Sequence, residues 1–443
     1  MDEKVRLIRT DAAGRGYEVD QRGLSRHRYA GTPTLEVDGA EGSHPLLGFG
    51  ASMTDASAWL LTTLTAEARA RLLEDLFGEK GLNLSIVRTN VGSSDYATEV
   101  YSYDDVAGDE EMRHFSVAHD EAYLIPTLRE VKAVCPEAFL FSSMWSCPGW
   151  MKLGGEMCGG YVRHRWLPAL ANYYTEYLKA YREHGLELDA YTIQNEPCTH
   201  QRGLMPAGIL HPEYEMELHA ELMPPRLAAA GLHPQVWMFD HNYSDWSLVA
   251  AMLDEPEVRR HVDAVAFHPY EGDASMLSQL LARHPGMTLH MTEKGPNLDA
   301  VSTGQDELWW TESICQALNH GCSSYVGWNI ALDEFGCPNV GPFRCSGLVE
   351  IHTGSQAITP SAQYRAFRHF APFARRGAEI LHCRRELDWP SELQAMAFRN
   401  PDGGLVLVFG NRGRQRMVQV HCRGAWLQVI LTPKSVSTLV LEP

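Results

Sequence analysis

Two glutamates stand where strand-like apolar runs end, and they are the residues of this chain best suited to catalysis. The run L-E-L-D-A-Y-T-I-Q-N-E-P (186–197) delivers Glu196 just before Pro197. Proline donates no backbone hydrogen bond and keeps the residue before it extended, so Glu196 belongs at a strand end. The run M-T-L-H-M-T-E-K-G-P (287–296) delivers Glu293 before a Gly-Pro break. Two strand-end carboxylates in a parallel barrel favour carboxylate-pair catalysis; the alternative is that each simply reaches water.

Composition limits the classes of partner. The 443 residues carry a formal charge of −18, which disfavours nucleic acid and anionic membrane surfaces as partners. No apolar run approaches the roughly 18 residues of a membrane-spanning helix, so we expect a globular protein without a transmembrane segment. The first residues, M-D-E-K-V-R-L-I-R-T, lack the apolar core of a signal peptide, and a cytoplasmic location is the expectation.

The cysteines and histidines show no recognisable metal motif. The ten cysteines are scattered, mostly in apolar segments, and we expect reduced thiols. Loop disulfides between Cys147 and Cys158, or between Cys337 and Cys345, remain the alternative. Neither a paired C-x-x-C nor an H-E-x-x-H occurs, so neither a metal nor a cofactor is expected.

Strand and helix patterns alternate through the middle of the chain. Thr65 is a plausible N-cap for a helix over 66–77, whose leucines recur at helical spacing. Further helices are expected over 119–134, 168–184, 212–231 (interrupted by Pro224 and Pro225), 246–254 and 306–320. The strand candidates are 46–53, 82–91, 138–146, 188–196, 235–242, 262–270, 288–293 and 323–332. Eight strands alternating with helices predict a (β/α)₈ TIM barrel, with its active site at the carboxyl ends of the strands.

The two ends of the chain have a different hydrophobic pattern, which is typical of antiparallel strands. After a helix over 361–375, five short alternating runs separated by D-G-G and N-R-G turns predict antiparallel strands. Two short strand-like runs near the N-terminus are too few for a domain alone. We therefore expect a β-sandwich side domain built from both chain termini, residues 1–43 and 361–443, appended to a catalytic barrel over 44–360.

The motifs along the barrel resemble those of the glucosylceramidase family, glycoside hydrolase family 30. They comprise G-F-G-A-S-M-T-D-A-S-A, I-V-R-T-N-V-G-S-S-D-Y, S-M-W-S-C-P-G-W-M-K, T-I-Q-N-E-P, A-F-H-P-Y, M-T-E and G-W-N-I-A-L-D-E-F-G-C-P-N. Their order and spacing are specific, although each motif alone is weak. The resemblance implies a barrel with a side β-sandwich. It also implies that Glu196 is the general acid/base and Glu293 the nucleophile.

Retaining hydrolysis then sets the geometry and the protonation states. The two carboxyl groups are expected about 5 Å apart. We predict that Glu196 is kept protonated near neutral pH by its surroundings and by the negative charge of Glu293.

The resemblance implies further residues around the sugar. Arg88 would hold Glu293 ionised, unless it forms only a scaffold ion pair. Asn195 would bind the sugar 2-hydroxyl, unless it caps the strand-end loop. Asp95 and Trp145 would form the pocket floor, with a turn aspartate and a core tryptophan as alternatives. Tyr270 would donate to the nucleophile.

Other assignments leave more open. His268 either orients a neighbour or satisfies backbone groups. Trp328 and Asn339 match family residues lining the sugar site, with a structural tryptophan as the alternative. This chain departs from the family at H-P-Y (268–270), where His-Trp-Tyr is common, and at Lys294. Trp309 and Trp310 form either an apolar lip for an aglycone or packing.

The leading hypothesis is an exo-acting, glucosylceramidase-like retaining β-glucosidase acting on a small-molecule or glycolipid β-glycoside. The alternatives are a β-1,6-glucanase or β-xylosidase on the same machinery, and a carbohydrate-binding barrel that has lost catalysis. A metal hydrolase using Asp240, His241 and His268 is a further class, although these residues lack a recognisable ligand spacing. The oligomeric state is not predicted.

Overall fold

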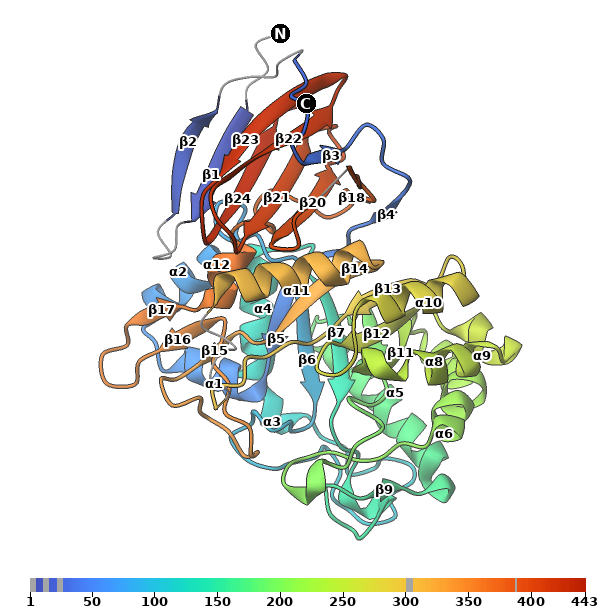
Figure 1. Cartoon of the computed structure of the whole chain (residues 1–443). Coiled ribbons are helices and arrows are strands. Elements are labelled where there is room, and N and C mark those ends of the chain that lie inside the picture. Colours follow the sequence, from blue (N-terminus) through green and yellow to red (C-terminus); the bar gives the residue numbers. More distant parts are fainter. Residues whose placement is uncertain (1–4, 11–15, 22–26, 300–305, 387–388) are drawn as a thin grey trace.

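The protein consists of a barrel and a β-sandwich placed on one end of it (Figure 1). This computed structural model describes residues 5–10, 16–21, 27–299, 306–386 and 389–443. Residues 1–4, 11–15, 22–26, 300–305 and 387–388 lie outside the described residues.

Eight parallel strands close the barrel, and each lies within or beside one of the eight predicted runs. Their order around the barrel is β5-β6-β7-β10-β11-β12-β13-β14, with β14 pairing back onto β5. Parallel strands covered by helices are buried on both faces and therefore read as continuous apolar runs, which is why the sequence predicts them well. Their bounds are β5 Gly48–Met53, β6 Ile86–Val91, β7 Phe139–Met144, β10 Ala190–Thr192, β11 Gln235–Asn242, β12 Ala264–His268, β13 Thr288–Met291 and β14 Cys322–Asn329.

Helices cover the outside of the barrel. Thr65 caps α2 as predicted, because its side chain accepts a hydrogen bond from the Ala68 N–H, and Leu72, Leu73 and Leu76 are buried. The helix bounds are α1 Asp55–Thr62, α2 Ala66–Phe77, α3 Ala118–Glu121, α4 Leu124–Val134, α5 Leu167–Glu183, α6 Pro212–Glu217, α7 Met223–Ala230, α8 Trp246–Leu253, α9 Pro256–His261, α10 Ser275–Arg283, α11 Glu307–Asn319 and α12 Ala362–Phe367. The sequence prediction lacked α1, α9 and α10, and α12 is shorter than the predicted helix over 361–375.

Two predicted helices are interrupted at prolines. The helix predicted over 119–134 divides into α3 and α4, and the break places Pro126 in the first turn of α4, where its missing N–H costs nothing. Between α6 and α7 the helix widens to a π-helical turn, Leu218–Leu222, and Pro224 and Pro225 stand at the start of α7.

Both chain ends contribute to the sandwich. One sheet has the order β2-β1-β24-β21-β20-β18-β4, and the facing sheet has the order β19-β3-β22-β23. Leu7, Leu407 and Val420 are among the residues of its core. The bounds are β1 Val5–Thr10, β2 Gly16–Gln21, β3 Thr34–Glu36, β4 Ser43–Pro45, β18 Glu379–Leu381, β19 Arg384–Glu386, β20 Leu393–Arg399, β21 Leu405–Asn411, β22 Arg416–Cys422, β23 Ala425–Leu431 and β24 Ser435–Leu441. The predicted barrel with a sandwich from both termini is therefore confirmed.

The sandwich covers the amino-terminal end of the barrel. The Leu46 N–H, just before β5, donates to the Ala378 carbonyl at 2.8 Å, and Phe49, Phe370 and Phe398 pack together. In Figure 1, β6 and β7 run away from the sandwich, so the carboxyl ends of the strands are at the far end. The loops contain further short strands: β8 Lys152–Leu153, β9 Tyr161–Val162, β15 Ala331–Leu332, β16 Val349–Ile351 and β17 Ile358–Pro360.

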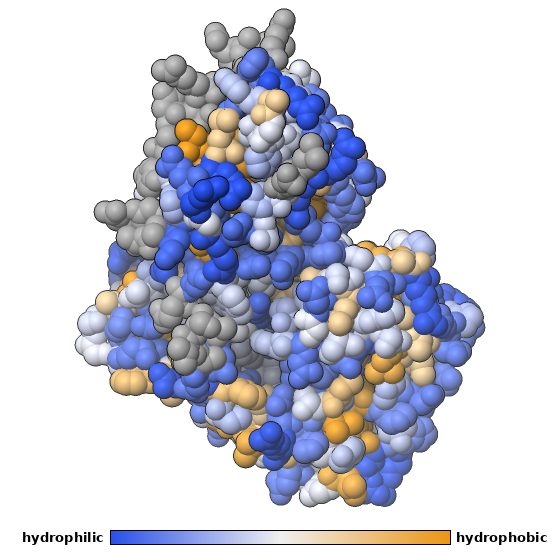
Figure 2. Space-filling model, viewed as in Figure 1, coloured by the Kyte–Doolittle hydropathy of each residue, from blue (hydrophilic) through white to orange (hydrophobic). Residues whose placement is uncertain are grey.

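The side of the molecule shown in Figure 2 is mostly hydrophilic, with hydrophobic patches on the lower part of the barrel. Within the described residues, no helix is both long and apolar enough to cross a bilayer.

Candidate active site

A cavity of about 640 Å³ opens at the carboxyl ends of the barrel strands. This volume suits a small organic ligand such as one or two sugar rings. Seven of the predicted site residues line it: Asp95, Trp145, Asn195, Glu196, Tyr270, Glu293 and Trp328. The remaining lining residues are Cys198, Thr199, Gln201, Met205, His241, Asn242, Asp245, Glu271, Gly295, Pro296, Asn297, Phe343 and Cys345.

The two strand-end glutamates meet in this cavity. One carboxylate oxygen of Glu196, one of Glu293 and a ring nitrogen of His268 all lie within 4.8 Å of one another. Glu196 has a left-handed backbone (φ 48°), and its N–H donates to the Asp240 carbonyl at 3.0 Å. Non-glycine residues in this conformation are held by their surroundings and concentrate at functional sites. The barrel thus brings together two residues separated by about a hundred positions in the chain.

Arg88 on β6 fixes the nucleophile candidate. Its side chain is fully buried and donates to Glu293, to the Asn195 side-chain oxygen (2.7 Å) and to Asp240 (2.7 Å). The guanidinium also lies 4.6 Å from the ring centre of Trp145. Arg88 is therefore an ion-pair partner of Glu293 within the site rather than a scaffold group elsewhere.

Removing the Arg88 charge is expected to destabilise the fold. Arg88→Met deprives two buried carboxylates, Asp240 and Glu293, of the guanidinium that pairs with both. Breaking a buried pair in this way costs about 3–5 kcal/mol. Urea unfolding of the wild type and the variant measures the difference. A loss of less than about 1 kcal/mol, the range of exposed pairs, would contradict this account of Arg88.

Asp240 is the centre of the hydrogen-bond network below the cavity. It is fully buried and accepts hydrogen bonds from Arg88, Ser143, Thr192 and Thr292, and it contacts the His268 ring. Burial alone would raise the pKa of Asp240, but the charges of Arg88 and His268 hold it well below the usual range. An irregularity in β11, with positive φ at Phe239 and Asp240, turns this side chain inward.

This arrangement argues against the metal-hydrolase alternative. The carboxylate oxygens of Asp240 are taken by donors that include Arg88. The His241 ring belongs to a separate group with Cys198 and Asp245, so Asp240, His241 and His268 do not form one ligand set.

The His268 ring contacts both glutamates on one side and Asp240 on the other. Its Nδ1 lies 3.2 Å from Glu196 Oε1 and 3.9 Å from Glu293 Oε1, and its Nε2 lies 3.0 Å from Asp240 Oδ1. Burial alone would lower the pKa of His268, but the charges of Glu293 and Asp240 raise it to about 9. The ring is therefore a cation at neutral pH, and of the two predicted roles the structure shows the orienting one.

The prediction that Glu196 is protonated at neutral pH is wrong for this site. Burial alone would raise the pKa of Glu196, but the hydrogen bond and charge of His268, with a contact from Gln201 Nε2 at 2.7 Å, bring it below its usual value. The prediction considered only the negative charge of Glu293. It left out the charge of His268, which contacts both carboxylates.

The His268 cation makes stability depend on pH. Because its folded pKa is about 9 and its ordinary value is 6.5, its contribution is complete below pH 6.5 and is lost as the pH rises through 9. We expect the stability difference between wild type and His268→Asn to shrink across this interval. Urea unfolding at several pH values measures it, and a constant difference would contradict the assignment.

Tyr270 and Asn195 complete the surroundings of the carboxylates. The Tyr270 hydroxyl donates to Glu293 Oε1 and accepts from the Gly295 N–H, both at 2.9 Å. The predicted donation to the nucleophile candidate is therefore present. Asn195 lines the cavity beside Glu196, with its side-chain oxygen held by Arg88.

The wall beside Glu293 combines two indoles and a carboxyl group. Trp145 and Trp328 stack with ring centres 4.9 Å apart. Asp95 is buried, and its Oδ1 has no hydrogen-bond partner among the described residues. Burial and the charge of Glu293 raise the pKa of Asp95 well above its usual value. An unpartnered polar oxygen beside aromatic faces is suited to a sugar hydroxyl.

Three predicted cavity-edge residues lie elsewhere. Asn339 is absent from the lining described above; its side chain bonds to the Phe343 carbonyl and the Gly341 N–H in its own loop. Trp310 is fully buried, and Trp309 packs over the Lys294 ammonium at 3.8 Å. The tryptophan pair is therefore packing, and Lys294 points away from the cavity toward Ser313.

Comparison with known proteins identifies the family. The sequence profile of the glycosyl hydrolase family 30 TIM-barrel domain matches residues 46–373, and that of the family 30 beta sandwich domain matches residues 378–439. The chain belongs to glycosyl hydrolase family 30. It is a glycoside hydrolase, as its resemblance to this family implied.

Relatives in family 30 differ in the substrates that their names give. The chain is 29% identical to an endo-1,6-beta-D-glucanase of Neurospora crassa, covering 96% of this chain and 92% of that protein. It is 26% identical to the lysosomal acid glucosylceramidase of Mus musculus, covering 91% and 82%. The solved endo-beta1,6-glucanase BT3312 superposes with a TM-score of 0.89 at 22% identity, over 99% of this chain and 100% of that one, which supports the fold.

All ten cysteines are free in this structure. Sequence reasoning missed Gln201 as a partner of Glu196 and the structural role of Asp240. An acidic residue inside the apolar run V-W-M-F-D-H-N was the available signal for Asp240.

Proposed function

We propose that this chain is a retaining β-glycosidase that cleaves a β-glucosyl bond through a covalent glycosyl-enzyme intermediate. The observation that carries the proposal is the approach of Glu196 and Glu293 to within 4.8 Å. Retaining enzymes hold their carboxyl groups about 5–5.5 Å apart, whereas inverting enzymes need roughly 6.5–9.5 Å to admit water.

In the first step Glu293 attacks the anomeric carbon while Glu196 passes a proton to the departing oxygen. Tyr270 and Arg88 each hold the Glu293 carboxylate in place. Glu196 receives its proton from His268 across the 3.2 Å hydrogen bond. In the second step Glu196 takes a proton from the water that attacks the anomeric carbon and releases Glu293, and this proton returns to His268, which restores the starting state.

The glucosyl ring occupies the wall beside Glu293. Asp95 binds sugar hydroxyls with its unpartnered oxygen, and the stacked indoles of Trp145 and Trp328 cover an apolar face of the ring. Asn195, oriented by Arg88, is placed for the 2-hydroxyl.

The leaving group we favour is a second glucose joined through a β-1,6 bond. Polar side chains also line the cavity, namely Gln201, Asn242 and Glu271. Such groups exchange further hydrogen bonds with sugar hydroxyls, whereas a lipid tail would desolvate them and offer none. The similarity to endo-1,6-glucanases over nearly the whole chain supports this choice.

Glucosylceramide is the second candidate. Similarity to glucosylceramidases favours it, and exposed Phe343 and buried Met205 give the cavity some apolar surface. A β-xyloside is the third candidate substrate.

A substrate panel separates these candidates. We expect kcat/KM for β-1,6-linked gluco-oligosaccharides to exceed that for β-1,3-linked and β-1,4-linked ones, and for detergent-dispersed glucosylceramide, by about tenfold or more, a difference of 1.4 kcal/mol. Proton NMR of the first product should show β-glucose. A preference for glucosylceramide or a β-xyloside would contradict the substrate, and initial α-glucose would contradict the mechanism.

Asn242→Ala tests the polar lining of the cavity separately from the catalytic groups. Losing one hydrogen bond is expected to cost about 1 kcal/mol, and therefore roughly fivefold in kcat/KM for the oligosaccharide. An aryl β-glucoside, which lacks the second sugar, serves as the control and should be hydrolysed almost as by wild type. An equal loss on both substrates would contradict the placement of the second sugar.

A further inference from the structure

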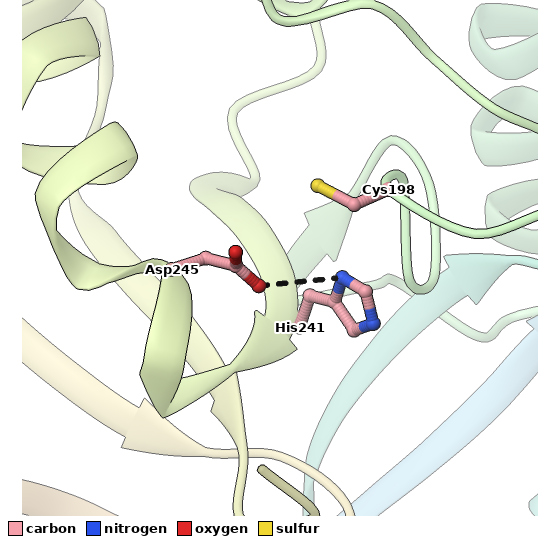
Figure 3. Close-up of side chains that lie close together, drawn as sticks. All are labelled: Cys198, His241 and Asp245. Carbon is pink, nitrogen blue, oxygen red and sulfur yellow. Dashed lines mark ion pairs between the residues drawn. The ribbon is translucent and has the colours of Figure 1, made fainter. Parts of the chain in front are cut away.

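Three side chains at the mouth of the cavity form a cluster that the glycosidase mechanism does not use. Cys198 lies in the loop after β10, His241 near the end of β11, and Asp245 just before α8. One ligand atom from each lies within 4.8 Å of the other two. Figure 3 shows the three side chains, from separate segments, around a common space.

One ring nitrogen of the imidazole in this cluster lacks a hydrogen bond. The His241 side chain is only 9% exposed, and its Nδ1 has no hydrogen-bond partner within the described part of the chain. The nearest acceptor on the cluster, Asp245 Oδ2, is 3.9 Å away, which is too far for a hydrogen bond. Buried polar atoms are normally satisfied, so an unpartnered imidazole nitrogen facing a thiol and a carboxylate indicates a missing ligand.

We propose that Cys198, His241 and Asp245 bind a zinc-like divalent cation, and that the bound ion inhibits hydrolysis by occupying the leaving-group half of the cavity. The inhibition rests on the proposed function; the binding does not.

The donor set selects the class of ion. A thiolate, an imidazole and a carboxylate are the ligand types of zinc, whereas calcium and magnesium prefer oxygen ligands throughout. Zinc–ligand bonds of about 2.0–2.3 Å place tetrahedral ligand atoms roughly 3.3–3.8 Å apart. The present separations therefore require a contraction of about 1.5 Å or less, within reach of side-chain rotation.

Charge and position account for the inhibition. A thiolate and a carboxylate together neutralise a divalent ion, and binding releases the thiol proton to solvent. Three protein ligands leave one coordination position, as in open zinc sites. All three residues line the substrate cavity, and Cys198 follows Glu196 by two positions. An ion here excludes the second sugar from this part of the cavity.

Metal binding is measured first, without reference to activity. Full-length protein, reduced with a phosphine that does not bind metals strongly, is titrated with zinc chloride by calorimetry. The same protein with cobalt(II) is examined for a thiolate charge-transfer band. We expect one zinc ion per chain and a cobalt–thiolate band. Cys198→Ala should remove the band and weaken zinc binding by more than the roughly 10–100-fold typical of changes around a metal ligand.

Cys337→Ala is the matched control, because Cys337 is the other exposed cysteine of the described residues and does not line the cavity. It should bind zinc like wild type. Stoichiometric binding that survives Cys198→Ala, or that is lost in Cys337→Ala, would overturn the site. Absence of binding would overturn it as well.

Inhibition is then measured as the activity of each variant with zinc relative to its own activity with a chelator. Wild type and Cys337→Ala should lose at least about tenfold in kcat/KM at saturating zinc, and Cys198→Ala should be much less sensitive, the tenfold corresponding to 1.4 kcal/mol. Binding without inhibition would overturn the inhibitory role. A chain that hydrolyses no glycoside would refute the proposed function, while the binding titration would still decide the metal site.

Discussion

Glu293→Gln is expected to lower kcat/KM for a β-glucoside by about 10⁴-fold or more, the scale seen when a covalent-catalysis residue is removed. Glutamine keeps the size of the side chain and can still contact Tyr270, but its neutral amide is a poor nucleophile for the anomeric carbon. The ion pair with Arg88 is lost as well. Initial rates of hydrolysis of an aryl β-glucoside by the wild type and by the variant measure this loss of kcat/KM.

Two controls make the Glu293 result interpretable. Thermal unfolding of the variant shows whether the site remains folded. Glu271→Gln changes an acidic residue that lines the same cavity without the Arg88 contact, and should lose less than about tenfold, or 1.4 kcal/mol. Activity of Glu293→Gln within tenfold of wild type would exclude this residue as the nucleophile.

Glu196→Gln is expected to depend strongly on the leaving group. For an oligosaccharide, whose leaving oxygen needs a proton, kcat/KM should fall by about 10²–10⁴-fold. For an aryl glucoside with an acidic phenol, formation of the intermediate needs no acid and kcat/KM should change little. Its kcat should still fall, because the base for the second step is missing.

Adding azide to the Glu196→Gln variant tests whether Glu196 is the acid/base. A small anion that needs no deprotonation should restore kcat on the activated substrate and yield β-glucosyl azide, because it attacks the intermediate in place of water. A uniform loss on both substrates, with no response to azide, would show that Glu196 is structural rather than the acid/base.

The barrel was predictable because its strands are buried on both faces. Runs such as S-S-Y-V-G-W-N-I-A-L are apolar without alternation, and helices with clear caps, such as the one starting after Thr65, separate them. The strand ends were less well predicted: the fourth run spans 188–196, while β10 covers only Ala190–Thr192. Pairing with neighbouring strands sets these ends, and a single sequence does not contain that information.

The site was predictable in its residue types and less so in its electrostatics. Glu196 and Glu293 stand out because a carboxylate ends an apolar run before a proline break. The inward turn of Asp240 depends on positive φ at two residues of β11, which neither phenylalanine nor aspartate signals. The pKa of Glu196 was predicted in the wrong direction because its sign depends on the His268 ring, 3.2 Å away but 72 positions along the chain.

The approach of Cys198, His241 and Asp245 also depends on the tertiary fold. His241 and Asp245 are four residues apart, but the loop that brings Cys198 beside them follows a different strand. Motif searches that require two cysteines or two histidines at short spacing therefore do not detect this cluster.

Covalent trapping tests the central claim most directly. The chain is incubated with a 2-deoxy-2-fluoro-β-glucoside carrying a good leaving group, digested with a protease, and analysed by mass spectrometry. The account predicts one fluoroglucosyl group per chain, on the peptide that contains Glu293, and no labelling of Glu293→Gln. Label on another residue, or an unlabelled chain that still hydrolyses β-glucosides, would contradict it.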